Sequence, residues 1–287
     1  MSDWVPASTR TVRYAVVASA LWAAGVITGL MSLKSNDAFE TVSELFLMAM
    51  LVVSISTVSW SAVKCSLRSR LGTGWMLVAI GLAVALVSTG YMLFLSRGSL
   101  HYQFNGADPT MTLGFLIGGV GLAVGASGVE RVASRIRPLL QASALAVIVF
   151  LVMLAALLAP GPGMPFSVGP RDVPAVWRLA IDCGCLLLPA VYATLAQLRL
   201  SSAHRARAWM WAAAGALVLA MGDVGAPLVD LGHGQLYPTM LWCLGVILLA
   251  GAASMTADFE LAEGAGPAEG VGPTEGAEKP LQPQPTV

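Results

Sequence analysis

The stretch TGWMLVAIGLAVALVSTGYMLFLS, from Thr73 to Ser96, contains no charged side chain. A helix that crosses the hydrocarbon core of a bilayer needs about 20 apolar residues. Seven further apolar runs of similar length occur, and the candidate spans cover residues 13–32, 41–63, 73–96, 110–129, 138–159, 174–198, 208–230 and 237–257. The sequence therefore predicts an all-α, polytopic membrane protein with eight transmembrane helices.

The composition agrees with a chain that is surrounded by lipid. Hydrophobic residues make up 56% of the 287 residues and charged residues only 11%, whereas about a quarter of the residues in a soluble domain are charged. The lipid bilayer is therefore the expected partner. Because 16 Lys and Arg are balanced by 16 Asp and Glu, the chain lacks the basic excess of a nucleic-acid-binding protein.

Basic residues are concentrated in alternate connections between the runs. The N-terminal segment and the second, fourth and sixth connections hold Arg10, Arg13, Lys64, Arg68, Arg70, Arg131, Arg135, Arg137, Arg199, Arg205 and Arg207. The connections between them hold only Lys34, Arg97 and Arg171. The positive-inside rule therefore predicts that both termini are cytoplasmic. Abundant Ala, Val, Gly and Arg with little Lys is typical of a GC-rich bacterium, so we expect the bacterial inner (plasma) membrane.

Two predicted outer hairpins share a short sequence pattern. One contains HYQF from His101 and the other HGQL from His233, and Pro-Thr-Met follows in both. A Trp-Met pair precedes each of them, at Trp75 and Trp209. The pattern predicts two parallel repeats of four helices, related by an axis along the membrane normal. Pro in a first helical turn is also a common helix start, which explains Pro-Thr-Met but not the matched His-x-Gln.

The predicted organisation has three parts. Residues 1–12 form a cytoplasmic N-terminus, and residues 13–258 form the membrane domain, with candidate repeats 13–129 and 138–257. Residues 259–287 are rich in Gly, Pro and Glu, so we expect a disordered cytoplasmic tail. A solvated tail is favoured over one that binds a partner.

Three carboxylates lie within the apolar runs, at Glu44, Asp182 and Asp223. An acid in a span is costly to insert and indicates a functional site by default. With the predicted topology, each acid lies about 10 Å below the outer helix ends. Glu44 and Asp182 are expected to be equivalent in the two repeats. Asp223 corresponds to about Gly90, which is flanked by Thr89 and Tyr91.

Several residues could accompany these acids in an outward-facing polar layer. Arg178 lies four residues before Asp182 and hence on the same helix face. The predicted ligand-binding residues are Asp223, Asp182, Glu44, Arg178, Arg97, Tyr91, His101 and His233. The alternative is a set of structural ion pairs that hold the helices together.

Sequence motifs for other chemistry are absent. Cys65, Cys183, Cys185 and Cys243 form no CxxC pair and are expected to be small core- or lipid-facing residues. We predict no metal, no cofactor and no catalytic residue, although two His and three acids leave a transition metal as a weaker alternative. The chain has no HExxH, Walker or GxSxG sequence.

The stretches RARAWMWAAAGALVLAMGDVGAPL and LYPTMLWCLGVILLAGAAS resemble a known type of membrane region. They are similar to the multi-pass regions that precede diguanylate cyclase and phosphodiesterase domains in actinobacterial signalling proteins. The shared features are Arg207, Trp209, Gly222-Asp223 and Trp242 with Leu244-Gly245. The resemblance implies a sensory membrane module that signals through a cytoplasmic partner, because no output domain follows.

Three functions remain open on the sequence. The first is a sensory or regulatory membrane protein that binds a ligand from outside in the polar layer. The second is a small-solute or proton-coupled transporter, which Pro189 favours because a proline frees a backbone carbonyl within a span. An intramembrane enzyme is the third and weakest.

Overall fold

The computed structural model describes residues 36–95, 107–129, 203–225 and 236–264, together with 18, 22, 25, 140–141, 144–145, 147–148, 151–152, 181–182 and 184–192. The long helices in this part are α2 (Asn36–Lys64), α3 (Arg70–Leu95), α4 (Ala107–Val129), α7 (Ala203–Gly225) and α8 (Leu236–Gly264). All regular structure within the described residues is helical, which confirms the all-α prediction. The predicted spans 13–32, 138–159 and 174–198 lie mostly outside the described residues.

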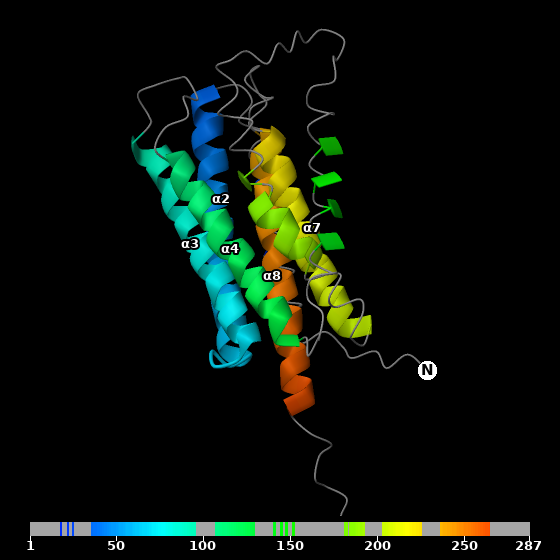
Figure 1. Cartoon of the computed structure of the whole chain (residues 1–287). Helices are drawn as coiled ribbons and strands as arrows, with labels where there is room; N and C mark the ends of the chain where they lie inside the picture. The colour runs from blue at the N-terminus through cyan, green and yellow to red at the C-terminus, as the bar shows by residue number, and fades with distance from the viewer. Residues whose placement is uncertain are drawn as a thin grey trace, which may run out of the picture.

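The long helices form one bundle in which neighbours along the chain run in opposite directions. In Figure 1, α2, α4 and α8 descend while α3 and α7 rise. Contacts are most extensive between α3 and α4 and between α7 and α8, and α2 packs against both α3 and α8. Helix α2 therefore links an α3–α4 hairpin to an α7–α8 hairpin.

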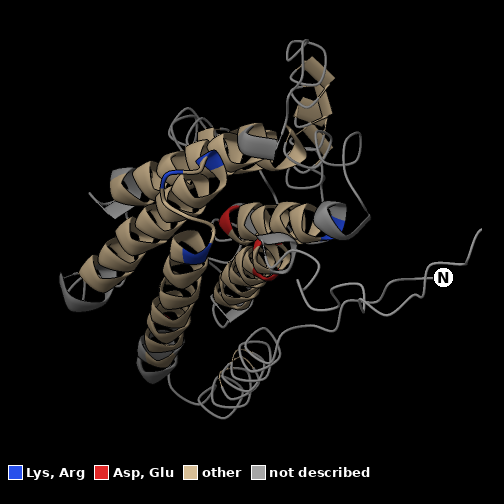
Figure 2. Cartoon of the chain, turned by 90° about the horizontal axis from the view of Figure 1, so that it is seen from below, with Lys and Arg blue, Asp and Glu red and all other residues tan. Residues whose placement is uncertain are grey.

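Four of the described helices are long and apolar enough to cross a membrane, over Glu44–Lys64, Arg70–Tyr91, Thr110–Ser127 and Thr239–Leu261. Charged residues colour only a few turns of the described helices in Figure 2. Large apolar side chains are exposed on the outside of the bundle, among them Val52, Ile80, Val87, Leu113, Leu116 and Val120. A water-soluble monomer rarely exposes apolar surface on this scale, and the chain is a multi-pass membrane protein.

The turn between α2 and α3 is defined by local hydrogen bonds. Ser66 follows the end of α2 in the left-handed region, with φ of 65°, and its amide donates to the carbonyl of Val63. Ser69 caps α3, because its Oγ accepts a hydrogen bond from the amide of Gly72 at 2.9 Å. The cap starts α3 at Arg70, three residues before the predicted run.

Helix α8 is longer than the predicted run, since it continues to Gly264. The first residues of the segment predicted to be disordered are therefore helical. Ala257 is fully buried against the bundle, and Phe259 and Leu261 extend the apolar pattern by another turn. Phe259 is partly buried whereas Leu261 is exposed, so packing against the bundle supports only the first part of this extension.

Both hairpins cross at a pair of facing glycines. A Cβ on Gly81 of α3 would lie 2.5 Å from the carbonyl oxygen of Gly114 of α4, and a Cβ on Gly114 would lie 2.8 Å from that of Gly81. Gly215 of α7 and Gly245 of α8 face each other in the same way, with both distances 2.9 Å. Small residues at such positions let helix backbones come into direct contact.

The two hairpins meet at a pair of tryptophans. The rings of Trp75 on α3 and Trp209 on α7 stack with centroids 5.5 Å apart and planes 20° from parallel. They are 1% and 3% exposed. This stack lies in the core between the first turns of the two rising helices.

Candidate ligand-binding site

Two of the three predicted acids are buried in the bundle. Asp182 is 1% exposed and Asp223, near the end of α7, is 9% exposed. Glu44, on α2, is half-buried. Because Asp223 is buried, its side chain faces the protein interior rather than the surrounding lipid.

Each acid lies one helical turn from a leucine that lines a shared cavity. Glu44 precedes Leu47 by three residues, and Asp182 precedes Leu186 by four. On the oppositely directed α7, Asp223 follows Leu219 by four. Residues three or four apart share a helix face. The three acids therefore belong to the faces that form the cavity, one turn nearer the upper end of Figure 1.

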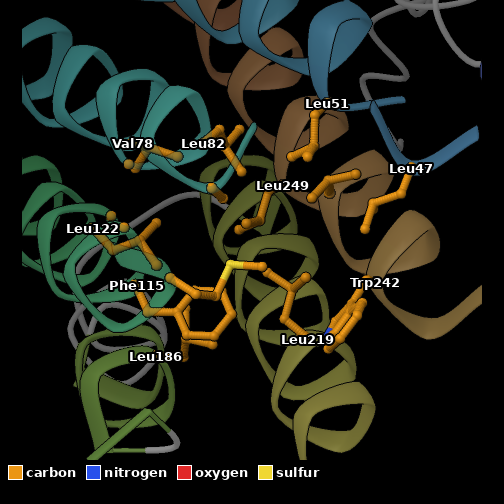
Figure 3. A pocket seen from close by; sticks show the side chains of 16 residues that line it. Leu47, Leu51, Val78, Leu82, Phe115, Leu122, Leu186, Leu219, Trp242 and Leu249 are labelled. Atoms are coloured by element: carbon orange, nitrogen blue, oxygen red, sulfur yellow. The ribbon is translucent and has the colours of Figure 1, made fainter. Parts of the chain in front are cut away.

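The cavity has a volume of about 40 Å³ and is lined by six helical segments. Its walls are Leu47, Leu51, Val78, Gly81, Leu82, Ala85, Met111, Gly114, Phe115, Gly118, Leu122, Leu186, Leu219, Trp242, Val246 and Leu249. Figure 3 shows the labelled side chains converging on this space from the surrounding helices. The lining is apolar, with space for about three water-sized groups.

Two lining residues, Trp242 and Gly118, differ from the aliphatic side chains around them. Trp242 is half-buried, and its indole nitrogen is enclosed with no hydrogen-bond partner in the described part of the chain. In Figure 3 this nitrogen lies on the ring edge that faces Leu219. Gly118 faces open space, because a Cβ added there would meet no atom within 4 Å.

The hydroxyl-bearing neighbours of the predicted site differ in burial. Tyr91 is 46% exposed on α3. Thr89 is buried, and its hydroxyl donates to the carbonyl of Ala85 at 3.0 Å. The predicted site residues Arg97, His101, Arg178 and His233 lie outside the described residues.

The carbonyl that Pro189 frees is turned toward a neighbouring helix. Proline has no N–H, so Pro189 leaves the carbonyl of Cys185, four residues earlier, without its helical donor. A Cβ on Gly119 of α4 would collide with this same oxygen. The carbonyl therefore packs against the α4 backbone, where a Cα–H···O contact is available, and the proline has a structural role at this crossing.

The described cysteines are thiols. Cys65 and Cys243 are buried and Cys185 is half-buried. Burial and, to a lesser extent, the charge of Glu260 near the end of α8 together raise the pKa of the Cys65 thiol to about 12. Within the described residues, no three His, Cys, Asp or Glu side chains lie close enough together to hold a metal ion.

Sequence reasoning singled out the acids but missed the cavity. The lining is drawn from six segments, and most of its residues are the Leu, Val and Gly that any membrane helix contains. The spacing of the three acids to Leu47, Leu186 and Leu219 was visible in the sequence. That these leucines line one cavity could be seen only once it was known which helices are neighbours.

No protein-family model, curated protein or solved structure matches this chain.

Proposed function

We propose that the chain is a sensory or regulatory membrane protein that binds a ligand in the layer formed by Asp182, Asp223 and Glu44. The observation that carries the proposal is the burial of two carboxyl groups, 1% and 9% exposed, in an otherwise apolar bundle. A carboxylate inside a membrane helix is costly to insert and indicates a functional site by default. We assign to these acids the recognition of a polar or cationic group of the ligand.

The position of the layer favours a ligand that enters from one side of the membrane. Glu44 near the start of α2 and Asp223 near the end of α7 belong to the upper end of the bundle in Figure 1, whereas Lys64, Arg68 and Arg70 belong to the turn between α2 and α3 at the lower end. Arg207 belongs to the first turns of α7, at the same lower end. With this end in the cytoplasm, as the positive-inside rule indicates, the acids face outward and both termini are inside a bacterial inner membrane.

The same proposal includes eight transmembrane helices in two parallel repeats. Gly81 and Gly215 each follow the stacked tryptophan of their helix by six residues, and each crosses its partner helix at a second glycine. Helix α2 contacts α8, and the segment 184–192 contacts α4 at Gly119. A two-fold axis between the repeats would map the contact between α2 and α8 onto the contact between the segment 184–192 and α4.

The repeat alignment makes Asp223 the site of broken symmetry. Asp223 follows Gly215 by eight residues, and Thr89 follows Gly81 by eight. One half therefore has a buried hydroxyl, bonded to its own helix, where the other has a buried acid. A duplicated scaffold that differs at a buried polar position is suited to one asymmetric ligand. By the resemblance to membrane regions of signalling proteins, the response passes to a cytoplasmic partner.

A thermal-shift screen of the purified protein in lipid nanodiscs tests the function. Small cations and polar metabolites are screened against the wild type, Asp223→Asn and Asp182→Asn, with Asp258→Asn at the other end of the bundle as the control. A ligand that stabilises the wild type and the control, but not the two site variants, supports the proposal. If Asp223→Asn unfolds several degrees lower and no compound distinguishes the proteins, the acids are structural ion pairs.

A further inference from the structure

We propose that the cavity below the acids binds a small apolar molecule with a single hydrogen-bond acceptor, which is held by the indole N–H of Trp242. This site is separate from the acid layer, so the proposal is tested independently of the function proposed above. Three features support this assignment: the apolar lining, the enclosed N–H of Trp242 and the open space beside Gly118.

The lining selects an apolar occupant. Fifteen of the sixteen lining residues are aliphatic, glycine, methionine or phenylalanine, and the remaining one is Trp242. A buried water needs two to four polar partners to be held. One N–H group cannot provide them, so water is a poor occupant and an apolar molecule is a good one.

The enclosed N–H of Trp242 explains why the occupant should also carry an acceptor. Buried polar groups are nearly always hydrogen-bonded, and an exception requires an explanation. The nitrogen of Trp242 has no partner in the described part of the chain. The nitrogen lies beside Leu219 in Figure 3, and Leu219 also lines the cavity, so the proposed site requires the Leu219 side chain to move aside when the ligand binds.

The size of the cavity limits the ligand to about three or four heavy atoms. Its volume of about 40 Å³ corresponds to about three water-sized groups. Gly118 borders this space without any neighbour in the path of a side chain. A short ketone, aldehyde or ether therefore fits, whereas a larger residue at position 118 would occupy the same space.

The chain contains an internal reference for the experiment. Trp75 also has a buried indole nitrogen without a partner among the described residues, but it does not line the cavity. Gly251 resembles Gly118 in that an added Cβ meets no atom within 4 Å, and it too lies outside the lining. Trp75 and Gly251 therefore serve as controls that distinguish binding in this cavity from general effects on the bundle.

Indole N–H resonances of the full chain in lipid nanodiscs provide the test, with Trp242 assigned through Trp242→Phe. Acetone is the probe, and isobutene, which has the same shape without the acceptor, is its control. We expect acetone to give a saturable downfield shift of the Trp242 signal and no shift of Trp75. Isobutene should compete with acetone but cause no downfield shift.

Blocking variants complete the test. Gly118→Leu should weaken acetone binding at least tenfold and Gly118→Ala less, while Gly251→Leu should bind as the wild type does. The proposal is overturned if acetone shifts Trp75 and Trp242 alike, if no shift saturates, or if Gly118→Ala and Gly118→Leu both bind with wild-type affinity. Loss of the shift in Gly251→Leu would equally overturn it.

Discussion

Trp75 and Trp209 stack at 5.5 Å between ring centroids, and through this contact the α3–α4 hairpin meets the α7–α8 hairpin. The rings are nearly parallel and almost completely buried. Close to them, a Cβ on Gly125 of α4 would approach the ring of Trp209 to 3.1 Å. The stack is therefore enclosed by α4 as well as by its own helices.

The first prediction concerns the energy of this stack. In a double-mutant cycle with Trp75→Leu and Trp209→Leu, the coupling free energy should be about 0.5–1.5 kcal/mol, which is typical of a buried aromatic pair. Unfolding of the purified protein in mixed micelles measures it. Trp75 and Trp242 lie toward opposite ends of the bundle, so the effects of Trp75→Leu and Trp242→Leu on the free energy of unfolding should be additive. Additive effects in the Trp75–Trp209 cycle would show that the stack contributes nothing beyond burial.

The second prediction compares the two glycine crossings. Gly81→Ala and Gly215→Ala each place a methyl group within 3 Å of a carbonyl oxygen on the facing helix. Each should destabilise the fold by about 1–3 kcal/mol, the usual range for overpacking. Gly251→Ala, which meets open space, should be neutral or slightly stabilising. Equal stabilities for all three variants would contradict the crossing geometry.

The third prediction is the low reactivity of Cys65. A thiol with a pKa of about 12 has about a thousandfold less thiolate at pH 8 than one with the ordinary pKa of 9.0, and the thiolate is the reactive species. Alkylation by iodoacetamide should therefore be slow and should accelerate as the pH rises towards 12. Glu260→Gln should increase the rate, because it removes a negative charge that opposes ionisation.

A control for Cys65 lies in the same turn. Leu67 is 49% exposed, so Leu67→Cys in a background without the native cysteines should react as an ordinary thiol does. Comparable rates for Cys65 and for this variant, measured by mass spectrometry, would show that Cys65 is accessible and ionises normally.

The fourth prediction concerns the start of α3. Ser69→Ala removes the acceptor for the Gly72 amide and should cost about 0.5–2 kcal/mol, whereas Ser69→Asp should keep most of the cap. Thermal unfolding of the three proteins side by side measures the difference. An alanine variant as stable as the wild type would mean that water satisfies this amide equally well.

The positions of the apolar runs correctly predicted the positions of the described helices, because the bilayer sets the length and the hydropathy of a helix that crosses it. Runs 41–63, 73–96, 110–129 and 237–257 each match a described helix, and 208–230 overlaps α7. The ends were less predictable. Ser69 and the left-handed Ser66 set the α2–α3 turn, and packing of Ala257 accompanies the extension of α8.

The acids were predictable as a candidate site, since few carboxylates occur in the apolar runs, and Asp182 and Asp223 are both buried. Their relation to the cavity was not predictable. It depends on which leucine faces meet, and apolar helix faces carry little information about their neighbours. The sequence also does not show which glycines face each other across two helices, because Gly114, Gly118, Gly119 and Gly121 lie close together on α4 and face different surroundings.

The glycine contacts join the helices into two closely packed groups, α3 with α4 and the segment 184–192, and α7 with α8. Helix α4 touches α3 at Gly114 and the segment 184–192 at Gly119 through backbone atoms, and α7 touches α8 in the same manner at Gly215. Such close-packed contacts have little compressibility. The cavity takes its walls from both groups and from α2, so we expect a relative displacement of the two groups to change the volume of the cavity before it disturbs the packing inside either group.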